Sequence, residues 1–269
     1  MSPLVMYGHG TAVLSCHPRF AQEQRTATGV FTLASNDHLR IADVSAFLFD
    51  VDGTLIDSNA AHAETWTQAL REQGIPCDVA DIRPLVGMGG DKLLPRIARL
   101  EEDSPQGRSI GQRKKTLFAE RLPHLPATPG ARALIAYLRQ LNKELAVATS
   151  AGDREMRALL QQAGVADLLP IRISKDDAAE SKPDPDIVQA ALKRAGASAD
   201  RTIMIGDTPF DIEAARRAGV ATIALRCGGY WSDADLHGAV AIVDDPAELL
   251  DYWAEPTTAD RLTRKLPDG

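Results

Sequence analysis

The sequence predicts an α/β fold with a doubly wound, mostly parallel sheet and a small α-helical domain inserted after the first strand. Short apolar runs alternate with helical patterns along most of the 269 residues. Polar or acidic residues directly follow three of these runs. Because the carboxyl ends of parallel strands border the same crevice, these residues are expected to form one site.

The predicted strands are short apolar runs bounded by turn residues. They cover Ala46–Asp50, Leu145–Thr149, Leu168–Ile173, Thr202–Ile205, Ala221–Leu225 and Val240–Val243. Helical patterns lie between them, at Ala131–Leu141, Arg154–Ala163, Ile187–Ala195 and Asp211–Ala218. Gly164, Gly196 and Gly219 follow the last three helices, where glycine favours the backbone conformation that ends a helix.

The interval 58–125 departs from this alternation because it contains helical patterns without a convincing strand. These patterns cover Ala60–Gln73, Asp91–Leu100 and Gln112–Leu122. We therefore predict a core domain at 44–57 and 126–253 and an inserted helical domain at 58–125. Residues 1–43 lack sustained periodicity and are expected to be a poorly ordered extension, and 254–269 a frayed polar tail.

Composition argues against several classes of partner. The formal net charge is −7, and there is no long basic run, so no nucleic-acid partner is expected. No apolar stretch approaches the ~18 residues of a membrane span, and no signal-peptide pattern opens the chain. Cys16, Cys77 and Cys227 are widely spaced and odd in number, which favours a reducing compartment. We expect a cytoplasmic monomer or homodimer without membrane contact.

The most informative segment is Asp50-Val51-Asp52-Gly53-Thr54, directly after the apolar run 46–49. Side chains two residues apart on a strand share a face, so the two carboxylates leave the strand together. Gly53 then lets the chain turn away sharply. Such an acidic pair is a weak signal alone, because Asp-Gly is also an ordinary turn marker.

Three later elements make the signal specific. They are Thr149-Ser150 after the second apolar run, Lys182 before the helix at 187–195, and Asp207 with Asp211 after the run 202–205. In this order, these elements resemble the haloacid dehalogenase superfamily of hydrolases, over roughly Val44 to Trp253. The resemblance is to the branch of phosphoglycolate phosphatases and β-phosphoglucomutase-like enzymes, and it implies that the helical insertion 58–125 is a cap domain.

The acidic residues predict a divalent cation. Asp50, Asp52, Asp207 and Asp211 are expected to converge, and carboxylates so close together cannot all remain ionised without compensation. Mg²⁺ suits these oxygen ligands, and the sequence shows no Cys or His cluster that would offer a zinc site. The resemblance implies ligation by Asp50, by the backbone carbonyl of Asp52 and by Asp207, with Asp211 bound directly or through water.

The resemblance also implies roles in phosphoryl transfer from a small phosphorylated metabolite, of the phosphoglycolate or sugar phosphate type. Asp50 is the expected nucleophile, forming an aspartyl phosphate, with Lys182 and Mg²⁺ neutralising the phosphoryl oxygens. Asp52 is the expected general acid and base. Thr149, with N–H groups around Ser150 at a helix start, is expected to hold a phosphate oxygen.

We also expect four further residues to contact the substrate. They are Gly53 and Thr54 in the first motif, and Gly90 and Lys92 in the glycine-rich cap segment 86–92. That segment can equally be a flexible linker between helices. His62 lies four residues before Trp66, on one helix face. The pair can simply steady the helix, whereas the resemblance places the histidine near the active site.

Four alternatives remain. A haloacid dehalogenase needs neither Asp52 nor the acidic cluster. A phosphomutase must hold a second phosphate, for which Ala151, Gly152 and Asp153 are unsuited. A phosphonate hydrolase needs a cap lysine, for which Lys92 or Lys114 are weak candidates. A non-enzymatic phosphosensor also uses Asp, Thr or Ser and Lys after strands, but such modules have only ~120 residues and no inserted cap. Lys175 is a less specific candidate than Lys182 for the lysine role.

Overall fold

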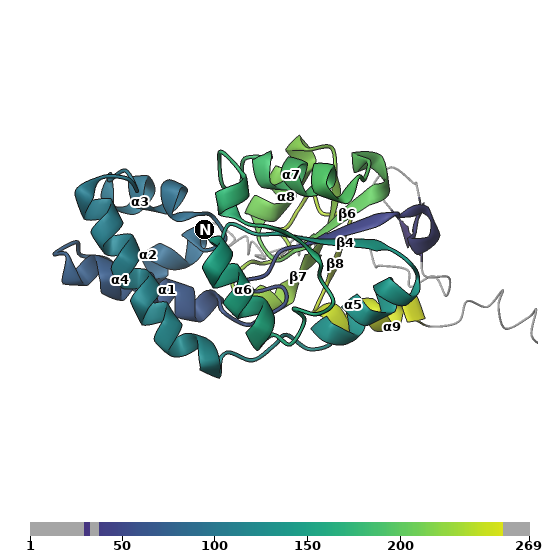
Figure 1. Ribbon diagram of the computed structural model, residues 1–269, viewed down its shortest axis with the longest axis horizontal. Coiled ribbons are helices and arrows are strands. Elements are labelled where there is room, and N and C mark those ends of the chain that lie inside the picture. Colours follow the sequence, from purple (N-terminus) through teal and green to yellow (C-terminus); the bar gives the residue numbers. More distant parts are fainter. Residues whose placement is uncertain (1–29, 33–37, 255–269) are drawn as a thin grey trace, which may run out of the picture.

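A computed structural model describes residues 30–32 and 38–254 and contains a six-stranded parallel sheet (Figure 1). The strand order is β5-β4-β3-β6-β7-β8, so β3 is central, and every neighbouring pair is parallel. The strands cover Ala46–Phe49 (β3), Glu144–Ala148 (β4), Ile171–Ile173 (β5), Thr202–Gly206 (β6), Ala221–Leu225 (β7) and Ala241–Val243 (β8). The predicted fold class is confirmed.

The fifth strand is shorter than predicted. β5 begins at Ile171 rather than Leu168. The chain turns just before it, where the Leu168 N–H donates to the Val165 carbonyl over 3.0 Å. Pro170 then has no N–H to offer a neighbouring strand. The apolar run 168–173 therefore contains a turn as well as a strand.

Helices cover both faces of the sheet. In Figure 1, α7 (Asp186–Ala195) and α8 (Pro209–Arg217) lie above it, and α5 (Ala131–Gln140) and α9 (Pro246–Ala254) lie below. The alternation of side chains in β3 explains both layers. Phe47 and Phe49 pack in one cluster with Leu134 and with residues of α6 (Asp153–Gln162), whereas Leu48 packs with Ile187 in the opposite one.

Two helices were not expected from the sequence, α9 and the short α2 (Val79–Ile82). The helix α9 begins at Pro246, a residue that suits the first turn of a helix because its missing N–H has no partner there anyway. Trp253 in α9 packs edge-on against Phe47, with ring centroids 5.4 Å apart. The helix therefore closes the hydrophobic core under the central strand.

Between β3 and α5 the structure contains helices only. They are α1 (Asn59–Glu72), α2, α3 (Gly90–Ala98) and α4 (Pro105–Arg121), with 3₁₀ turns at Arg83–Leu85 and Leu122–His124. Residues 58–125 are all described, and none of them lies in a strand. Their hydrophobic cluster, which includes Trp66, Leu70, Leu93 and Ile110, is separate from those of the sheet. This separation supports the proposed cap domain.

The helix α4 begins seven residues before the predicted start at Gln112. Its first residue is Pro105, and the hydroxyl of Ser104 accepts a hydrogen bond from the Gly107 N–H over 3.0 Å. Ser followed by Pro is a good helix start. Gly107 and Gly111 weaken the helical signal in this segment, which explains the late prediction.

Only part of the predicted extension is described. Within residues 1–43, β1 (Val30–Thr32) and β2 (His38–Arg40) pair as antiparallel strands, and a 3₁₀ turn follows at Ile41–Asp43. Residues 1–29 and 33–37 of the extension and 255–269 of the tail lie outside the described residues. None of the described helices is both long and apolar enough to cross a membrane.

Gly130, at the start of α5, lies against α9. Its φ is +73°, and a Cβ atom there would lie 2.5 Å from both the Cα and the N of Ala247. Both atoms belong to the backbone, so no side-chain movement would relieve this contact. A glycine is therefore required both by the local conformation and by the close approach of the two helices.

We predict that Gly130→Ala destabilises the protein more than Gly74→Ala. Both residues have a positive φ, +73° and +76°, but no atom lies within 4 Å of a Cβ built at Gly74. Gly74→Ala should cost about 1 to 2 kcal/mol of strain. Gly130→Ala should add about 1 to 3 kcal/mol of overpacking. Urea unfolding of both variants measures the difference, and equal losses would contradict the packing argument.

Candidate active site

The central position of β3 brings the predicted motifs together. Asp50 follows β3, and its N–H donates to the Ile205 carbonyl of β6 over 2.9 Å. Thr149 follows the neighbouring β4, and Asp207 follows β6 on the other side. The three polar residues therefore meet at the carboxyl edge of the sheet, as their positions after parallel strands predict.

Three buried carboxylates form a cluster at this edge. Asp50, Asp207 and Asp211 each offer one carboxylate oxygen, and these oxygens lie within 4.8 Å of one another. Asp211 is in the first turn of α8, where its side chain accepts hydrogen bonds from the Thr208 N–H and hydroxyl. This reciprocal capping of the helix fixes the position of the carboxylate.

Lys182 lies inside the acidic cluster and is fully buried. Its Nζ donates to Oδ1 of Asp50 over 2.6 Å and to Oδ1 of Asp211 over 2.7 Å. Burial alone would lower the pKa of Lys182, but the charges of Asp211 and Asp50 outweigh it and raise that pKa. The lysine is thus held in its charged form between two carboxylates.

One lysine does not balance three carboxylates. Burial raises the pKa of Asp50 to about 7, because it outweighs the opposing charge of Lys182, and Asp211 adds to the rise. Burial and the charge of Asp211 likewise raise the pKa of Asp207 well above its usual range. A divalent cation would offset this repulsion, and the donor set of carboxylate oxygens fits Mg²⁺. The predicted metal ligands Asp50, Asp207 and Asp211 therefore fit such an ion.

Asp207 is supported by the first motif and by α1. The hydroxyl of Thr54 donates to Oδ1 of Asp207 over 3.2 Å, and Nδ2 of Asn59 donates to Oδ2 over 2.7 Å. At Gly53, with φ +75°, a Cβ atom would collide with the Asp207 carboxylate and the Asn59 amide. Neither Gly53 nor Thr54 is among the residues that line the pocket, and their contact with substrate stays a prediction.

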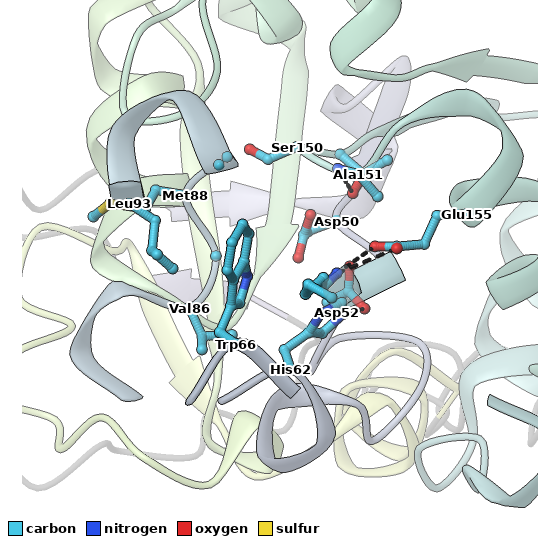
Figure 2. Close-up of a pocket in the computed structure, with 15 residues that line it drawn as sticks. Asp50, Asp52, His62, Trp66, Val86, Met88, Leu93, Ser150, Ala151 and Glu155 are labelled. Carbon is cyan, nitrogen blue, oxygen red and sulfur yellow. Dashed lines mark hydrogen bonds and ion pairs between the residues drawn. The ribbon is translucent and has the colours of Figure 1, made fainter. Parts of the chain in front are cut away.

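A pocket opens between the core and the cap beside this cluster (Figure 2). Asp50, Asp52, Thr149 and Ser150 line it from the core, together with Ala151 and Glu155. The cap contributes His62, Trp66, Val86, Gly87, Met88, Gly89, Gly90, Leu93 and Lys114. The predicted nucleophile and the predicted acid and base therefore face the same space as the predicted cap residues His62 and Gly90.

The side chain of Asp52 is outside the three-carboxylate cluster, so the expected convergence of four carboxylates is limited to three. Oδ1 of Asp52 lies 2.7 Å from Nε2 of His62 and accepts from the Ser58 hydroxyl over 2.5 Å. Burial would raise the pKa of Asp52, but His62, Ser58 and Lys114 together lower it. The contacts with Ser58 and His62, at and just before the start of α1, turn the carboxylate toward the cap. The role of its backbone carbonyl in metal binding remains a prediction.

His62 is the predicted cap residue that contacts the first motif directly. Its ring stacks on Phe118 of α4, with centroids 4.0 Å apart and planes 15° from parallel. The stacking fixes the ring so that Nε2 faces Asp52. Packing against the helix and contact with the site, the two interpretations left open by the sequence, therefore both describe this histidine.

Thr149 and Ser150 line the pocket, and the helix that they precede begins one residue before the predicted start at Arg154. The Thr149 hydroxyl accepts from the Ala151 N–H over 3.1 Å, and α6 begins at Asp153 after Gly152. The Ser150 hydroxyl accepts a longer hydrogen bond from the Lys182 N–H, at 3.4 Å. The segment 149–152 is therefore a turn lining the pocket rather than the first turn of α6.

Lys92 points away from the pocket. Its Nζ forms ion pairs with Glu180 and, at 3.0 Å, with Asp184, both on the core loop before α7. Lys92 is the third residue of α3, and this places its side chain over that loop instead of the pocket. In this structure Lys92 therefore joins cap and core and does not line the pocket, and its contact with substrate stays a prediction.

Lys175 makes a similar contact. Its Nζ pairs with Glu102 and, at 3.0 Å, with Asp91, both in the cap. Asp91 also accepts from the Ser181 hydroxyl over 2.8 Å, and that hydroxyl accepts from the Gly89 N–H over 3.2 Å. Lys175 therefore holds cap and core together, whereas Lys182 alone of the two lysines contacts the acidic cluster.

Sequence reasoning missed Asn59 and Glu155 and gave Lys114 only a weak mention. Nδ2 of Asn59 reaches the Gly228 carbonyl as well as Asp207, and Nζ of Lys114 donates to both carboxylate oxygens of Glu155 over 3.1 and 3.2 Å. A polar residue at a helix start usually indicates a cap. A charged residue within a helix usually indicates a solvent-exposed face. Neither pattern distinguishes these residues in the sequence.

Comparison with known proteins places the chain in a family. Residues 47–225 match the family described as haloacid dehalogenase-like hydrolase. A phosphoglycolate phosphatase of Rhodospirillum rubrum is 31% identical over 81% of this chain and 94% of its own length. An N-acetylmuramic acid 6-phosphate phosphatase of Pseudomonas aeruginosa is 32% identical over 77% and 94%.

The crystal structure of a hydrolase from Pseudomonas syringae matches the fold with a TM-score of 0.73, at 30% identity, and covers 80% of this chain and 100% of that one. The chain belongs to the haloacid dehalogenase-like hydrolase family. The family resemblance and the class of enzyme that the sequence predicts, a phosphatase-type hydrolase, are confirmed.

We predict that Mg²⁺ stabilises the folded protein through the acidic cluster. A ligand that binds only the folded state raises the melting temperature, here by roughly 5 to 10 °C at about 100 times the dissociation constant. Asp207→Asn should remove most of this shift. Thermal unfolding with and without MgCl₂ measures it.

The matched control is Asp200→Asn, since Asp200 is exposed and outside the cluster. This variant should keep the full response to Mg²⁺. An unchanged shift in Asp207→Asn, or none in the wild type, would contradict the metal site.

Proposed function

We propose that this protein is a Mg²⁺-dependent phosphatase that hydrolyses a small phosphorylated metabolite through an aspartyl phosphate on Asp50. One observation carries the proposal. Asp50 lines the pocket while Lys182 holds its carboxylate at the edge of the acidic cluster, and Asp52 lines the same pocket two residues away. A nucleophile, its counter-charge and a second carboxylate are thus assembled around one space.

In the first step, a carboxylate oxygen of Asp50 attacks phosphorus and the bond from phosphorus to the leaving oxygen breaks. Lys182 balances the charge of Asp50 before the attack and that of the phosphoryl group during it. The turn 149–152 offers the Thr149 and Ser150 hydroxyls at the pocket wall. Mg²⁺, held by Asp50, Asp207 and Asp211, would supply further positive charge near the phosphoryl oxygens.

Asp52 transfers the protons. Its low pKa in the unliganded site means that it must take up a proton in the substrate complex, which it then donates to the leaving oxygen. In the second step it accepts a proton from the water that attacks the aspartyl phosphate, and this restores the protonated form. In the described structure both hydrogen bonds to the Asp52 carboxylate go to Oδ1, which leaves Oδ2 to face the reacting groups. Ser58, just before α1, and His62, within α1, fix the carboxylate. The cap element that closes the pocket therefore also orients the acid and base.

The named relatives support a small substrate. Phosphoglycolate and N-acetylmuramic acid 6-phosphate appear in the names of phosphatases that resemble this chain over most of its length. The cap residues between Trp66 and Leu93 cover the pocket and restrict the size of the group attached to the phosphate. Both observations favour a metabolite over a phosphorylated macromolecule.

The alternatives fit less well. The positions at which a phosphomutase would hold a second phosphate are Ala151, Gly152 and Asp153, and these offer no cationic side chain. Lys114, the pocket lysine available to a phosphonate hydrolase, is held as a hydrogen-bond donor to Glu155. Neither a dehalogenase nor a phosphosensor requires Asp52 to be held in the pocket by His62.

We predict that Asp50→Asn lowers phosphate release by several orders of magnitude, because the amide is not a nucleophile for phosphorus. The test measures phosphate release from a panel of phosphorylated metabolites, with Mg²⁺ and with chelator. Release by the wild type should require the metal. The melting temperature of the variant confirms that it folds, and substantial metal-dependent release by Asp50→Asn would contradict the assignment of the nucleophile.

We predict that Asp52→Asn slows both chemical steps, by roughly 10²- to 10⁴-fold with an alkyl phosphate. An aryl phosphate with an acidic phenol needs little protonation of its leaving oxygen, so its first step should be affected less. The aspartyl phosphate should then accumulate, because its hydrolysis lacks the base. Rapid-quench measurement detects this intermediate, and equal losses for alkyl and aryl phosphates without accumulation would contradict the dual role.

A further inference from the structure

The pocket wall contains one ion pair beside an otherwise apolar cap surface. Apart from Asp50, Asp52 and His62, the ionisable side chains that line the pocket are Lys114 and Glu155. The cap surface around them consists of Trp66, Val86, Met88, Leu93 and the glycine backbone of 87–90. Figure 2 shows Trp66 facing Asp50, and Glu155 reaching toward the side of the pocket that holds Asp52.

Lys114 and Glu155 join the two domains within the pocket. Lys114 lies on α4 of the cap and Glu155 on α6 of the core, and their side chains are only 7% and 16% exposed. Nζ of Lys114 is 3.1 and 3.2 Å from the two carboxylate oxygens and 4.6 Å from the centroid of the Phe118 ring. The pair places one positive and one negative charge together, so this part of the wall has no net charge.

The pair shares the pocket with Asp52, the proposed donor to the leaving oxygen. His62, which contacts Asp52, stacks on the Phe118 ring, and Nζ of Lys114 lies 4.6 Å from the centroid of the same ring, so these side chains lie together in the pocket. The rest of the substrate then extends between Asp52, Trp66 and the ion pair. This region, rather than the acidic cluster, contacts the part of the substrate that differs between phosphate monoesters.

We infer that Lys114 and Glu155 select monoesters whose leaving group is uncharged and carries hydroxyl groups, as in a polyol or sugar monophosphate. This inference rests on the proposed phosphatase function. A hydroxyl accepts a hydrogen bond from Lys114 and donates one to Glu155, so it satisfies both partners. The face of the Trp66 ring offers an apolar surface for the carbon skeleton.

A second anion does not suit the same wall. A carboxylate or second phosphate accepts from Lys114 but lies beside Glu155, and like charges so placed repel strongly. Displacing Glu155 from Lys114 would leave that carboxylate unpaired in a largely buried position, which is also unfavourable. Glu155 therefore acts against anionic leaving groups, and Lys114 and Glu155 together favour neutral ones.

The experiment compares two substrates of nearly equal size, 2-hydroxyethyl phosphate and phosphoglycolate. The first carries a CH₂OH group where the second carries a carboxylate. The measured quantity is the ratio of their kcat/KM values. The wild type should favour 2-hydroxyethyl phosphate at least about tenfold, because like charges disfavour the carboxylate. In Glu155→Gln the ratio should move toward phosphoglycolate by at least about tenfold, since the repulsion is removed and Lys114 is freed.

Glu120→Gln is the matched control, because Glu120 lies on α4 with Lys114 but is exposed and outside the pocket. Its ratio should equal that of the wild type. Should Glu155→Gln fail to fold, the double variant Lys114→Gln with Glu155→Gln retains a neutral, hydrogen-bonding pair and should still accept 2-hydroxyethyl phosphate while binding phosphoglycolate no better.

Two outcomes would overturn the inference: a wild type that does not prefer 2-hydroxyethyl phosphate, or a kcat/KM ratio that Glu155→Gln moves no more than Glu120→Gln does. Both outcomes are measured on phosphate release that is lost in Asp50→Asn, so they leave the phosphatase assignment intact. Release from neither compound nor from any member of the metabolite panel would instead overturn the proposed function itself, and the inference with it.

Discussion

The burial of three carboxylates around a single lysine is the constraint on which the rest of this site depends. Asp50 and Asp207 meet because β3 and β6 end at one edge of the sheet, and Asp211 joins them from the first turn of α8, which begins there. Lys182 offsets only part of their charge. A largely apolar protein interior tolerates this excess of negative charge only when further positive charge offsets it. The fold therefore favours the binding of a cation at the place where a phosphate would bind.

Much of the surrounding structure supports this cluster without entering the pocket. Thr54 and Asn59 donate to Asp207, Thr208 shares hydrogen bonds with Asp211, and Gly53 leaves room for the Asp207 carboxylate. These contacts hold each carboxylate in one orientation despite the repulsion between them. The segment after β3 therefore serves mainly to build the acidic site, and the cap and the turn 149–152 form the space above it.

The sequence predicted the fold and the residues of the cluster because their signals are local. An apolar run followed directly by Asp50 or Asp207 is visible in a few residues, and the order of the motifs along the chain is specific. The ends of helices were harder to place where glycines interrupt the pattern, as at Gly107 before the predicted start of α4. The turn before Ile171 was hidden within an apolar run.

The contacts that the sequence did not predict are long-range. Asn59 and Asp207 are 148 residues apart, and Lys114 and Glu155 are 41 apart on different domains. Lys92 and Lys114 both pair with carboxylates of the core, but only Lys114 lines the pocket, because this depends on how α3 and α4 lie against the core. Lys92 and Lys114, similar in sequence context, therefore have different surroundings, and no local pattern separates them.

Ser181 and Lys182 are adjacent, yet they contact different domains. The Ser181 hydroxyl bonds to Asp91 and Gly89 of the cap, and the next side chain bonds to Asp50 at the centre of the core. A single peptide bond therefore links a contact with the helical insertion to the counter-ion of Asp50, the proposed nucleophile. Any displacement of the insertion that broke the Ser181 contacts would act one residue away from the lysine that balances the charge of Asp50.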